Sequence, residues 1–248
     1  AGDRSGHSVS LSADGQTVAI GAHDNDGNGY NSGHVRIYSW TGSSWSKLGE
    51  DIDGEASGDY SGSSVSLSAD GQTVAIGAYG NNDNGNDSGQ VRIYSWNGSG
   101  WIKLGADIDG ESSSDYSGHS VSLSADGQTV AIGAHENDGN GNRSGHVRIY
   151  SWNGFTWSQL GADIDGEAAG DRSGHSVSLS ADGQTVAIGA HENDGNNGVQ
   201  SGHVRIYSWN GSSWTQLRAD IDGEAVNDLS GCSVSLSADG QIVAIGAY

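Results

Sequence analysis

Histidine recurs at three fixed positions of a repeating pattern, and imidazole is a side chain that can ligate a metal ion. The histidines are His7, His23, His34, His119, His135, His146, His175, His191 and His203. One copy of the pattern lacks all three at once, with Ser63, Tyr79 and Gln90 in their places. Loss as a set indicates that the three positions contact one another. Neutral imidazoles suit a divalent transition metal. The alternative is a polar cluster in which each histidine hydrogen-bonds to the backbone.

Oxygen-rich loops form a second candidate metal site. The loop that starts at Asp24 has oxygen donors at positions 1, 3 and 5 and glycine at position 6, like the start of a calcium loop. The candidate calcium ligands are Asp24, Asp26, Asn28, Glu136, Asp138, Asn140, Glu192, Asp194 and Asn196. A full EF-hand also needs a bidentate Glu at position 12, where Val35 stands. Because Gly, Asn and Asp are also the residues of any tight exposed turn, a plain turn is the alternative.

A third recurring group consists of carboxylates near the end of each copy. They are Asp51, Asp53, Glu55, then Asp107, Asp109, Glu111, then Asp163, Asp165, Glu167, and finally Asp220, Asp222, Glu224. Their oxygens could bind calcium. They could also pair with Arg36, Arg92, Arg148 and Arg205 and so link one copy to the next, or they could be solvated linkers.

Tryptophan occurs in pairs around a short turn, and an exposed pair could stack on a sugar ring. The pairs are Trp40 with Trp45, Trp96 with Trp101, Trp152 with Trp157, and Trp209 with Trp214. The alternative is a cross-strand aromatic pair, which stabilises a sheet by roughly 0.2–1 kcal/mol. No Gly-x-Ser-x-Gly elbow is present, and a site repeated in every copy differs from the single pocket of most enzymes.

The charge of the chain limits its partners. The net charge is −21, with only 10 Lys and Arg residues, so we expect no binding to nucleic acid, which requires clustered basic residues. No apolar run is long enough to span a membrane, and we expect no membrane insertion. The chain begins at Ala1 without a signal peptide, as a mature or excerpted segment would. Asn-x-Ser motifs are candidate glycosylation sites in a secretory pathway, at Asn86, Asn97, Asn142 and Asn210.

The elements that position these residues repeat about every 56 residues. The predicted units of one repeat domain, residues 1–248, are 5–60, 61–116, 117–172 and 173–229, with a partial unit at 230–248. Within a unit the apolar residues alternate, which indicates strands. We expect strands at residues 7–12, 17–22 and 34–40, and a fourth that in later units starts at Trp101, Trp157 or Trp214 and runs through Leu104, Leu160 or Leu217. The predicted fold is all-β, with tandem four-stranded antiparallel blades in a β-propeller or propeller-like repeat array.

The motifs of these strands resemble those of a known family. The segments Ser5-Gly-His-Ser-Val9, Gly21-Ala-His23 and Gly33-His-Val-Arg-Ile-Tyr38 are similar to the Phe-Gly-x-Ser-Val, Gly-Ala-Pro and Gly-x-Val-x-Val-Tyr motifs of the integrin-type FG-GAP repeat. The chain departs from the family where Phe is Ser and Pro is His or Tyr. It also lacks the calcium loop of the family, because only Ala13-Asp14-Gly15-Gln16 joins the first two strands, which is too short to wrap an ion. The resemblance implies a propeller with an extracellular, interaction-type role.

We therefore expect a non-enzymatic module, extracellular or on the cell surface, for adhesion, matrix building or filament assembly, with calcium as its candidate cofactor. Its partners would be proteins, glycans or further copies of itself. The alternatives are a carbohydrate-binding propeller and an enzyme whose site is not visible in the repeat. About 4.4 units fit no closed propeller of four to eight blades. The chain is thus expected to be part of a longer array or to assemble end to end through unpaired strand edges.

Overall fold

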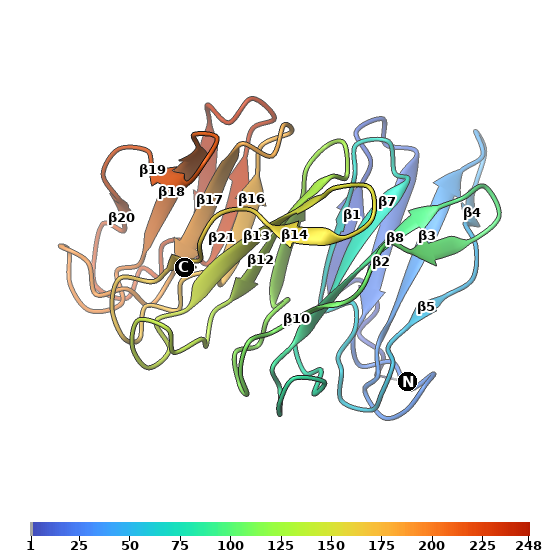
Figure 1. The fold of residues 1–248 in the computed structure, drawn as a ribbon, viewed down its shortest axis with the longest axis horizontal. Helices are drawn as coiled ribbons and strands as arrows, with labels where there is room; N and C mark the ends of the chain where they lie inside the picture. The colour runs from blue at the N-terminus through green and yellow to red at the C-terminus, as the bar shows by residue number, and fades with distance from the viewer. Residues whose placement is uncertain (1) are drawn as a thin grey trace.

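The computed structural model describes residues 2–248, which are all-β and contain no helix. Each of the first four units folds into one antiparallel sheet, and the sheets follow one another in chain order, from the blue first unit to the orange fourth (Figure 1). No helix that could span a membrane occurs in this part of the chain.

The strand bounds repeat from unit to unit. Unit 1 contains β1 (Ser8–Leu11), β2 (Thr17–Ala22), β3 (His34–Trp40), β4 (Trp45–Lys47) and β5 (Ile52–Asp53). Unit 2 contains β6 (Ser64–Leu67), β7 (Thr73–Ala78), β8 (Gln90–Trp96), β9 (Trp101–Lys103) and β10 (Ile108–Asp109). Unit 3 contains β11 (Ser120–Leu123), β12 (Thr129–Ala134), β13 (His146–Trp152), β14 (Trp157–Gln159) and β15 (Ile164–Asp165). Unit 4 contains β16 (Ser176–Leu179), β17 (Thr185–Ala190), β18 (His203–Trp209), β19 (Trp214–Gln216) and β20 (Ile221–Asp222), and the chain ends with β21 (Ser233–Leu236) and β22 (Val243–Gly246).

The predicted fourth strand, from Trp101 through Leu104 in unit 2, is observed as the short strand β9, and a further short strand that was not predicted also pairs with the third strand. In unit 2, β9 and β10 both pair with β8, and residues 104–107 separate them. Leu104 still donates a backbone hydrogen bond to Ile93 (2.7 Å), but Gly105 has a φ of 82°. This φ favours glycine and turns the chain out of the strand. A side chain at Gly105 would also collide with Trp152 of the next unit.

The hydrophobic core lies between consecutive sheets. One buried cluster joins Val35 and Ile37 of unit 1 to Val65 and Leu67 of unit 2, and similar clusters join units 2 and 3 and units 3 and 4. Val65 is 8% exposed, whereas its equivalent Val9, which no preceding unit covers, is 62% exposed. Burial of such a side chain contributes roughly 1.5–3 kcal/mol. Each unit therefore depends on its neighbours for a core.

Polar groups of the first strands also join the units. The Ala13 N–H donates to the Ala69 carbonyl (2.9 Å), and the same bond recurs between each pair of consecutive units along the array. Ser120 Oγ donates to the carbonyl of Gly174 in the next unit (2.8 Å). At this junction the backbones approach so closely that a Cβ at Gly133 would collide with the Gly174 carbonyl. The repeated serines and glycines of the sequence are therefore explained by contacts between units.

Candidate metal centre

Two of the recurring histidines meet at one end of units 1, 3 and 4. In unit 3, His119 directly precedes β11 and His135 directly follows β12. These strands are antiparallel neighbours, with Ser120 paired to Gly133. The two imidazoles are therefore adjacent, with ring centroids 4.1 Å apart.

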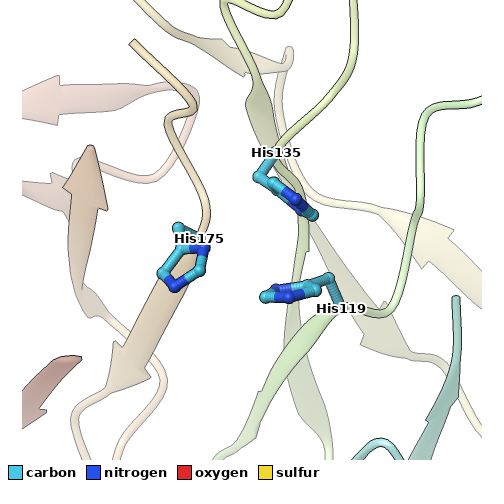
Figure 2. Close-up of side chains that lie close together, drawn as sticks. All are labelled: His119, His135 and His175. Atoms are coloured by element: carbon cyan, nitrogen blue, oxygen red, sulfur yellow. The ribbon is translucent and has the colours of Figure 1, made fainter. Parts of the chain in front are cut away.

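The third histidine at this place comes from the next unit. His175 precedes β16, and its ring centroid is 4.9 Å from that of His119 and 5.5 Å from that of His135. One ring nitrogen of each residue lies within 4.8 Å of the other two, and the rings surround a common point (Figure 2). We call His119, His135 and His175 the histidine cluster. It corrects the predicted grouping, in which His146 was the third member.

The histidine cluster is largely buried and uncharged at neutral pH. Burial lowers the pKa of His119 to about 4 and that of His175 to about 3, and it lowers the pKa of His135 further. His135 is 9% exposed, and the Nδ1 atoms of all three rings are buried without a hydrogen-bond partner. Such atoms cost free energy when they remain unpaired, and neutral imidazole nitrogens are good ligands for Zn²⁺ and related ions.

The equivalent positions in other units hold different side chains. His7 and His23 are adjacent, with centroids 4.1 Å apart, but Ser63 stands at the third position. His175 and His191 are also adjacent (3.9 Å), and Cys232 occupies the equivalent position of the following unit. Among residues 2–248, the histidine cluster is therefore the one group in which three imidazole nitrogens converge.

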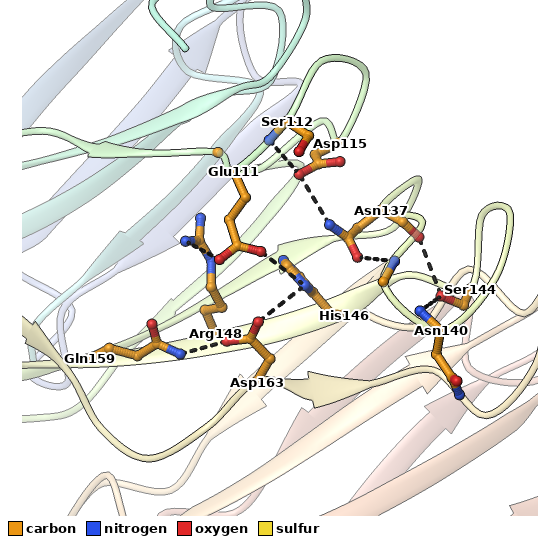
Figure 3. A network of polar contacts seen from close by, with 12 residues as sticks. Glu111, Ser112, Asp115, Asn137, Asn140, Ser144, His146, Arg148, Gln159 and Asp163 are labelled. Atoms are coloured by element: carbon orange, nitrogen blue, oxygen red, sulfur yellow. Dashed lines mark hydrogen bonds and ion pairs between the residues drawn. The ribbon is translucent and has the colours of Figure 1, made fainter. Parts of the chain in front are cut away.

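The third-strand histidines lie elsewhere, beside carboxylates, so the prediction that His34, His146 and His203 contact the other histidines is wrong. His146 Nδ1 lies 4.0 Å from Glu111 Oε2 and 3.9 Å from Asp163 Oδ2 (Figure 3). The positions of these residues on their strands explain why the third-strand histidines lie apart from the others. His146 begins β13 and pairs with Asp165 of the carboxylate segment, whereas His119 and His135 lie outside the ends of β11 and β12.

The predicted calcium loops are organised as turns. The Oδ1 atoms of the central aspartates accept backbone hydrogen bonds within the loop, from Asn31 to Asp26 (2.8 Å), from Arg143 to Asp138 (2.7 Å) and from Gln200 to Asp194 (2.9 Å). The amides of Asn28 and Asn140 donate to the carbonyls of Gly54 and Gly166 (both 2.8 Å), and Asn196 donates to Asp222 (3.1 Å).

The acidic residues at the start of these loops face arginines. Asp24 pairs with Arg4 (2.9 Å), and Glu136 pairs with Arg143 (2.8 Å) and Arg172 (3.1 Å). Arg172 also pairs with Glu192 (2.7 Å). The geometry thus favours the turn interpretation, because the loop carboxylates already accept hydrogen bonds from backbone amides or pair with arginines.

The arginines of the third strand join consecutive units, as one interpretation of the sequence predicts. Arg148 Nη2 donates to the Asp109 carbonyl of unit 2 (2.7 Å), and Nη1 lies 3.5 Å from Glu111. Arg92 and Arg205 make equivalent contacts with the units that precede them. Arg36, in the first unit that the structure describes, pairs with Asp51 of its own unit (2.9 Å).

The tryptophans form cross-strand pairs that also pack between units. Trp152 is paired with Trp157 in the register of β13 and β14, and their rings are 5.4 Å apart. The Trp157 indole donates to the carbonyl of Leu104 in unit 2 (2.8 Å), and Trp101 and Trp214 donate likewise to Leu48 and Leu160. This arrangement favours the packing interpretation over a sugar-binding one.

The four candidate glycosylation asparagines are exposed, but their motifs differ in accessibility. Ser88 and Ser144, which complete the motifs of Asn86 and Asn142, are fully buried. Ser99 and Ser212, which complete the motifs of Asn97 and Asn210, are exposed and donate hydrogen bonds to those asparagines. The turn motifs at Asn97 and Asn210 are therefore the more accessible pair.

Comparison with known proteins agrees with this architecture. A family model described as FG-GAP repeat matches residues 1–38, 52–94, 103–150 and 163–207, which is more than half of the chain. No curated protein matches the chain. Among solved structures, it is similar to the periplasmic gluconolactonase PpgL of Pseudomonas aeruginosa, a β-propeller, with a TM-score of 0.62 and 18% identity. That match covers 96% of this chain and 64% of the gluconolactonase chain. At this identity the likeness concerns the fold alone.

Proposed function

The chain belongs to the FG-GAP repeat family, and from this premise we propose that it is a non-enzymatic interaction module outside the cell or on its surface, with a divalent transition metal bound between units 3 and 4. The histidine cluster is the observation that carries this proposal. Its three ring nitrogens converge from two units, and each ring has a buried Nδ1 atom without a partner.

Zinc is the ion that the ligand set suits best. Zinc binds histidine nitrogens at about 2.0–2.1 Å and accepts three of them with a fourth position open. Around a tetrahedral zinc ion the ligand nitrogens are roughly 3.4 Å apart. The nitrogens of the histidine cluster lie within 4.8 Å of one another, and small rotations of the three rings would bring them to this separation. Because His175 belongs to the next unit, a bound ion would fix units 3 and 4 to each other.

The adhesion, matrix or filament role rests on the repetition itself. The same turns recur about every 56 residues on an acidic surface with a net charge of −21. A partner that binds one unit meets nearly the same surface at the next, so weak contacts add through multivalency. Contacts between units use the serines, arginines and tryptophans, and this leaves the turns at the sheet ends for a partner.

Zinc titration of the metal-depleted chain by calorimetry tests the metal site. We expect one tight equivalent at the histidine cluster, in addition to zinc held at sites that contain carboxylates, and a melting temperature raised by about 5–10 °C at a hundredfold excess over Kd, since a ligand of the folded state then stabilises it by about 2.7 kcal/mol. The double variant H119S/H135Y copies Ser63 and Tyr79 of unit 2, so its residues fit the fold, and it should lose the equivalent. The matched variant H7S should keep it, and loss in both variants or in neither would contradict the proposal.

The interaction role needs a separate measurement. We expect the intact chain, immobilised on a surface, to retain extracellular proteins or glycans. At equal density of immobilised protein, variants with surface mutations in two units should retain less than variants with mutations in one unit. Catalytic turnover of a small molecule at a unit-specific pocket, without such retention, would contradict the proposal.

A further inference from the structure

We propose that two groups at the unit junctions, Glu111/His146/Asp163 and Glu167/His203/Asp220, are a second class of divalent-cation site, which binds Mn²⁺ or a similar ion through one imidazole and two carboxylates. We call them junction group 3 and junction group 4. They are separate from the histidine cluster, and the inference does not depend on the zinc proposal.

Junction group 3 is assembled from two units. Glu111 follows the last strand of unit 2, His146 begins β13 of unit 3, and Asp163 precedes β15. One ligand atom of each residue lies within 4.8 Å of the other two. His146 is 1% exposed, and its Nδ1 lies 3.9–4.0 Å from one oxygen of each carboxylate. These separations are too long for hydrogen bonds, but they fit ligands that share one ion after a contraction of about 0.5 Å.

The remaining oxygen of each carboxylate is held by a different donor, as in protein metal sites. Glu111 Oε1 faces Arg148 (3.5 Å), while Oε2 faces His146. Asp163 Oδ1 accepts a hydrogen bond from Gln159 (2.5 Å), while Oδ2 faces His146. Partners that orient the ligand side chains in this way are a regular feature of metal sites.

Junction group 4 repeats this arrangement in the next unit. His203 is 1% exposed, and its Nδ1 lies 3.8 Å from Asp220 Oδ2. Gln216 donates to Asp220 Oδ1 (2.6 Å), and Arg205 lies 3.5 Å from Glu167 Oε1. The same ligand atoms therefore converge at two successive junctions.

Units 1 and 2 have similar positions in which side-chain cations or an amide already satisfy the carboxylates. In unit 2, Gln90 replaces the histidine and donates to Asp83 and Asp109 (3.2 Å each), and Lys103 pairs with Asp107. In unit 1, His34 is present, but Arg36 and Lys47 both bind Asp51. Units 3 and 4 have glutamine at the lysine position, and so their carboxylate pairs lack an ammonium partner. We therefore expect two junction sites.

The identity of the ion follows from the ligands. Two carboxylates and one imidazole suit a hard or borderline divalent ion, and carboxylate ligands favour Mn²⁺ more than a cluster of imidazoles does. Junction group 3 would bridge units 2 and 3, and junction group 4 would bridge units 3 and 4. Each ion would lie on one side of a third strand, and the strands that carry the histidine cluster lie on its other side.

Electron paramagnetic resonance of free Mn²⁺ tests the inference, because the bound ion loses its sharp solution signal. The metal-depleted full chain is titrated with Mn²⁺ in the presence of millimolar Ca²⁺, which occupies sites made of oxygen ligands alone. We expect two equivalents for the unmodified chain, one for H146Q, and none for H146Q/H203Q. These variants copy Gln90 of unit 2, so an unchanged circular dichroism melt of the metal-free protein is expected.

A control separates this inference from the proposed zinc site. The variant H119S/H135Y should keep both Mn²⁺ equivalents, and H146Q/H203Q should keep its zinc equivalent at the histidine cluster. The absence of Mn²⁺ binding to the unmodified chain, or undiminished binding to folded H146Q/H203Q, would overturn the inference.

Discussion

The indole Nε1 of Trp157 donates a 2.8 Å hydrogen bond to the backbone carbonyl of Leu104, 53 residues earlier in the preceding unit. The same side chain pairs with Trp152 across β13 and β14. One tryptophan thus stabilises its own hairpin and fixes the hairpin to the unit before it.

We expect W157F to lower the free energy of unfolding by about 1–3 kcal/mol, because it leaves the Leu104 carbonyl without its donor. Trp45 is the matched control, since it is 46% exposed and lies in the first unit that the structure describes. W45F should change stability by less than about 0.5 kcal/mol. Urea unfolding of both variants measures the difference, and equal losses would show that the hydrogen bond between units contributes little.

The arginines provide a similar comparison. R148M removes the donor to the Asp109 carbonyl and the charge beside Glu111, and we expect a loss of about 1.5–3 kcal/mol in the metal-free protein. R36M removes an ion pair within unit 1 that is more exposed, and it should cost about 0.2–1 kcal/mol. Thermal unfolding at two salt concentrations separates these effects, because the exposed pair is the one that salt screens. A larger loss for R36M than for R148M would be inconsistent with the structure.

Gly133 in the second strand of unit 3 is required because the backbones of two units approach closely there, and not because of its φ. A Cβ at Gly133 would collide with the Gly174 carbonyl of the next unit, whereas a Cβ at Gly100 meets no atom. We expect G133A to cost about 1–3 kcal/mol through overpacking, and G100A to be nearly neutral. Proteolysis at the junction of units 3 and 4 should increase in G133A alone, and identical behaviour of the two variants would argue against this packing.

Local patterns predicted the strands well because alternation and the Asp-Gly turn act over a few residues. The predicted strands at 17–22 and 34–40 match β2 and β3, and the propeller-like fold is confirmed. The fifth short strand, β10 in unit 2, was not predicted, and the break before it at Gly105 involves a contact with Trp152 of the next unit.

The histidine grouping could not be predicted from one unit. Replacement of all three histidines in unit 2, by Ser63, Tyr79 and Gln90, suggested contact, but Gln90 lies with Asp83 and Asp109 instead. The partner of His119 and His135 is His175, which is 56 residues after His119. Adjacency of the first strands in consecutive units was the signal that could have found it, since β11 contacts β16.

The pH dependence of stability tests the burial of the histidine cluster. Burial lowers the pKa of His119 to about 4 and that of His175 to about 3 from an ordinary value near 6.5. Below pH 6.5 the unfolded chain therefore binds more protons than the folded chain, and stability decreases as the pH falls. Above pH 6.5 these histidines do not lower the free energy of unfolding. Below pH 6.5 they lower it progressively until the folded-state pKa is reached.

Between pH 7 and pH 5 each buried histidine should cost at most about 2 kcal/mol, at about 1.4 kcal/mol per pH unit. We expect the metal-free chain to lose several degrees more in melting temperature over this interval than H119S/H135Y, which removes two of the titrating groups. Carboxylates that titrate at lower pH are common to both proteins, so the difference between the two curves reports the histidines. Parallel curves would mean that the imidazoles are solvated, and the basis for the zinc site would be lost with their burial.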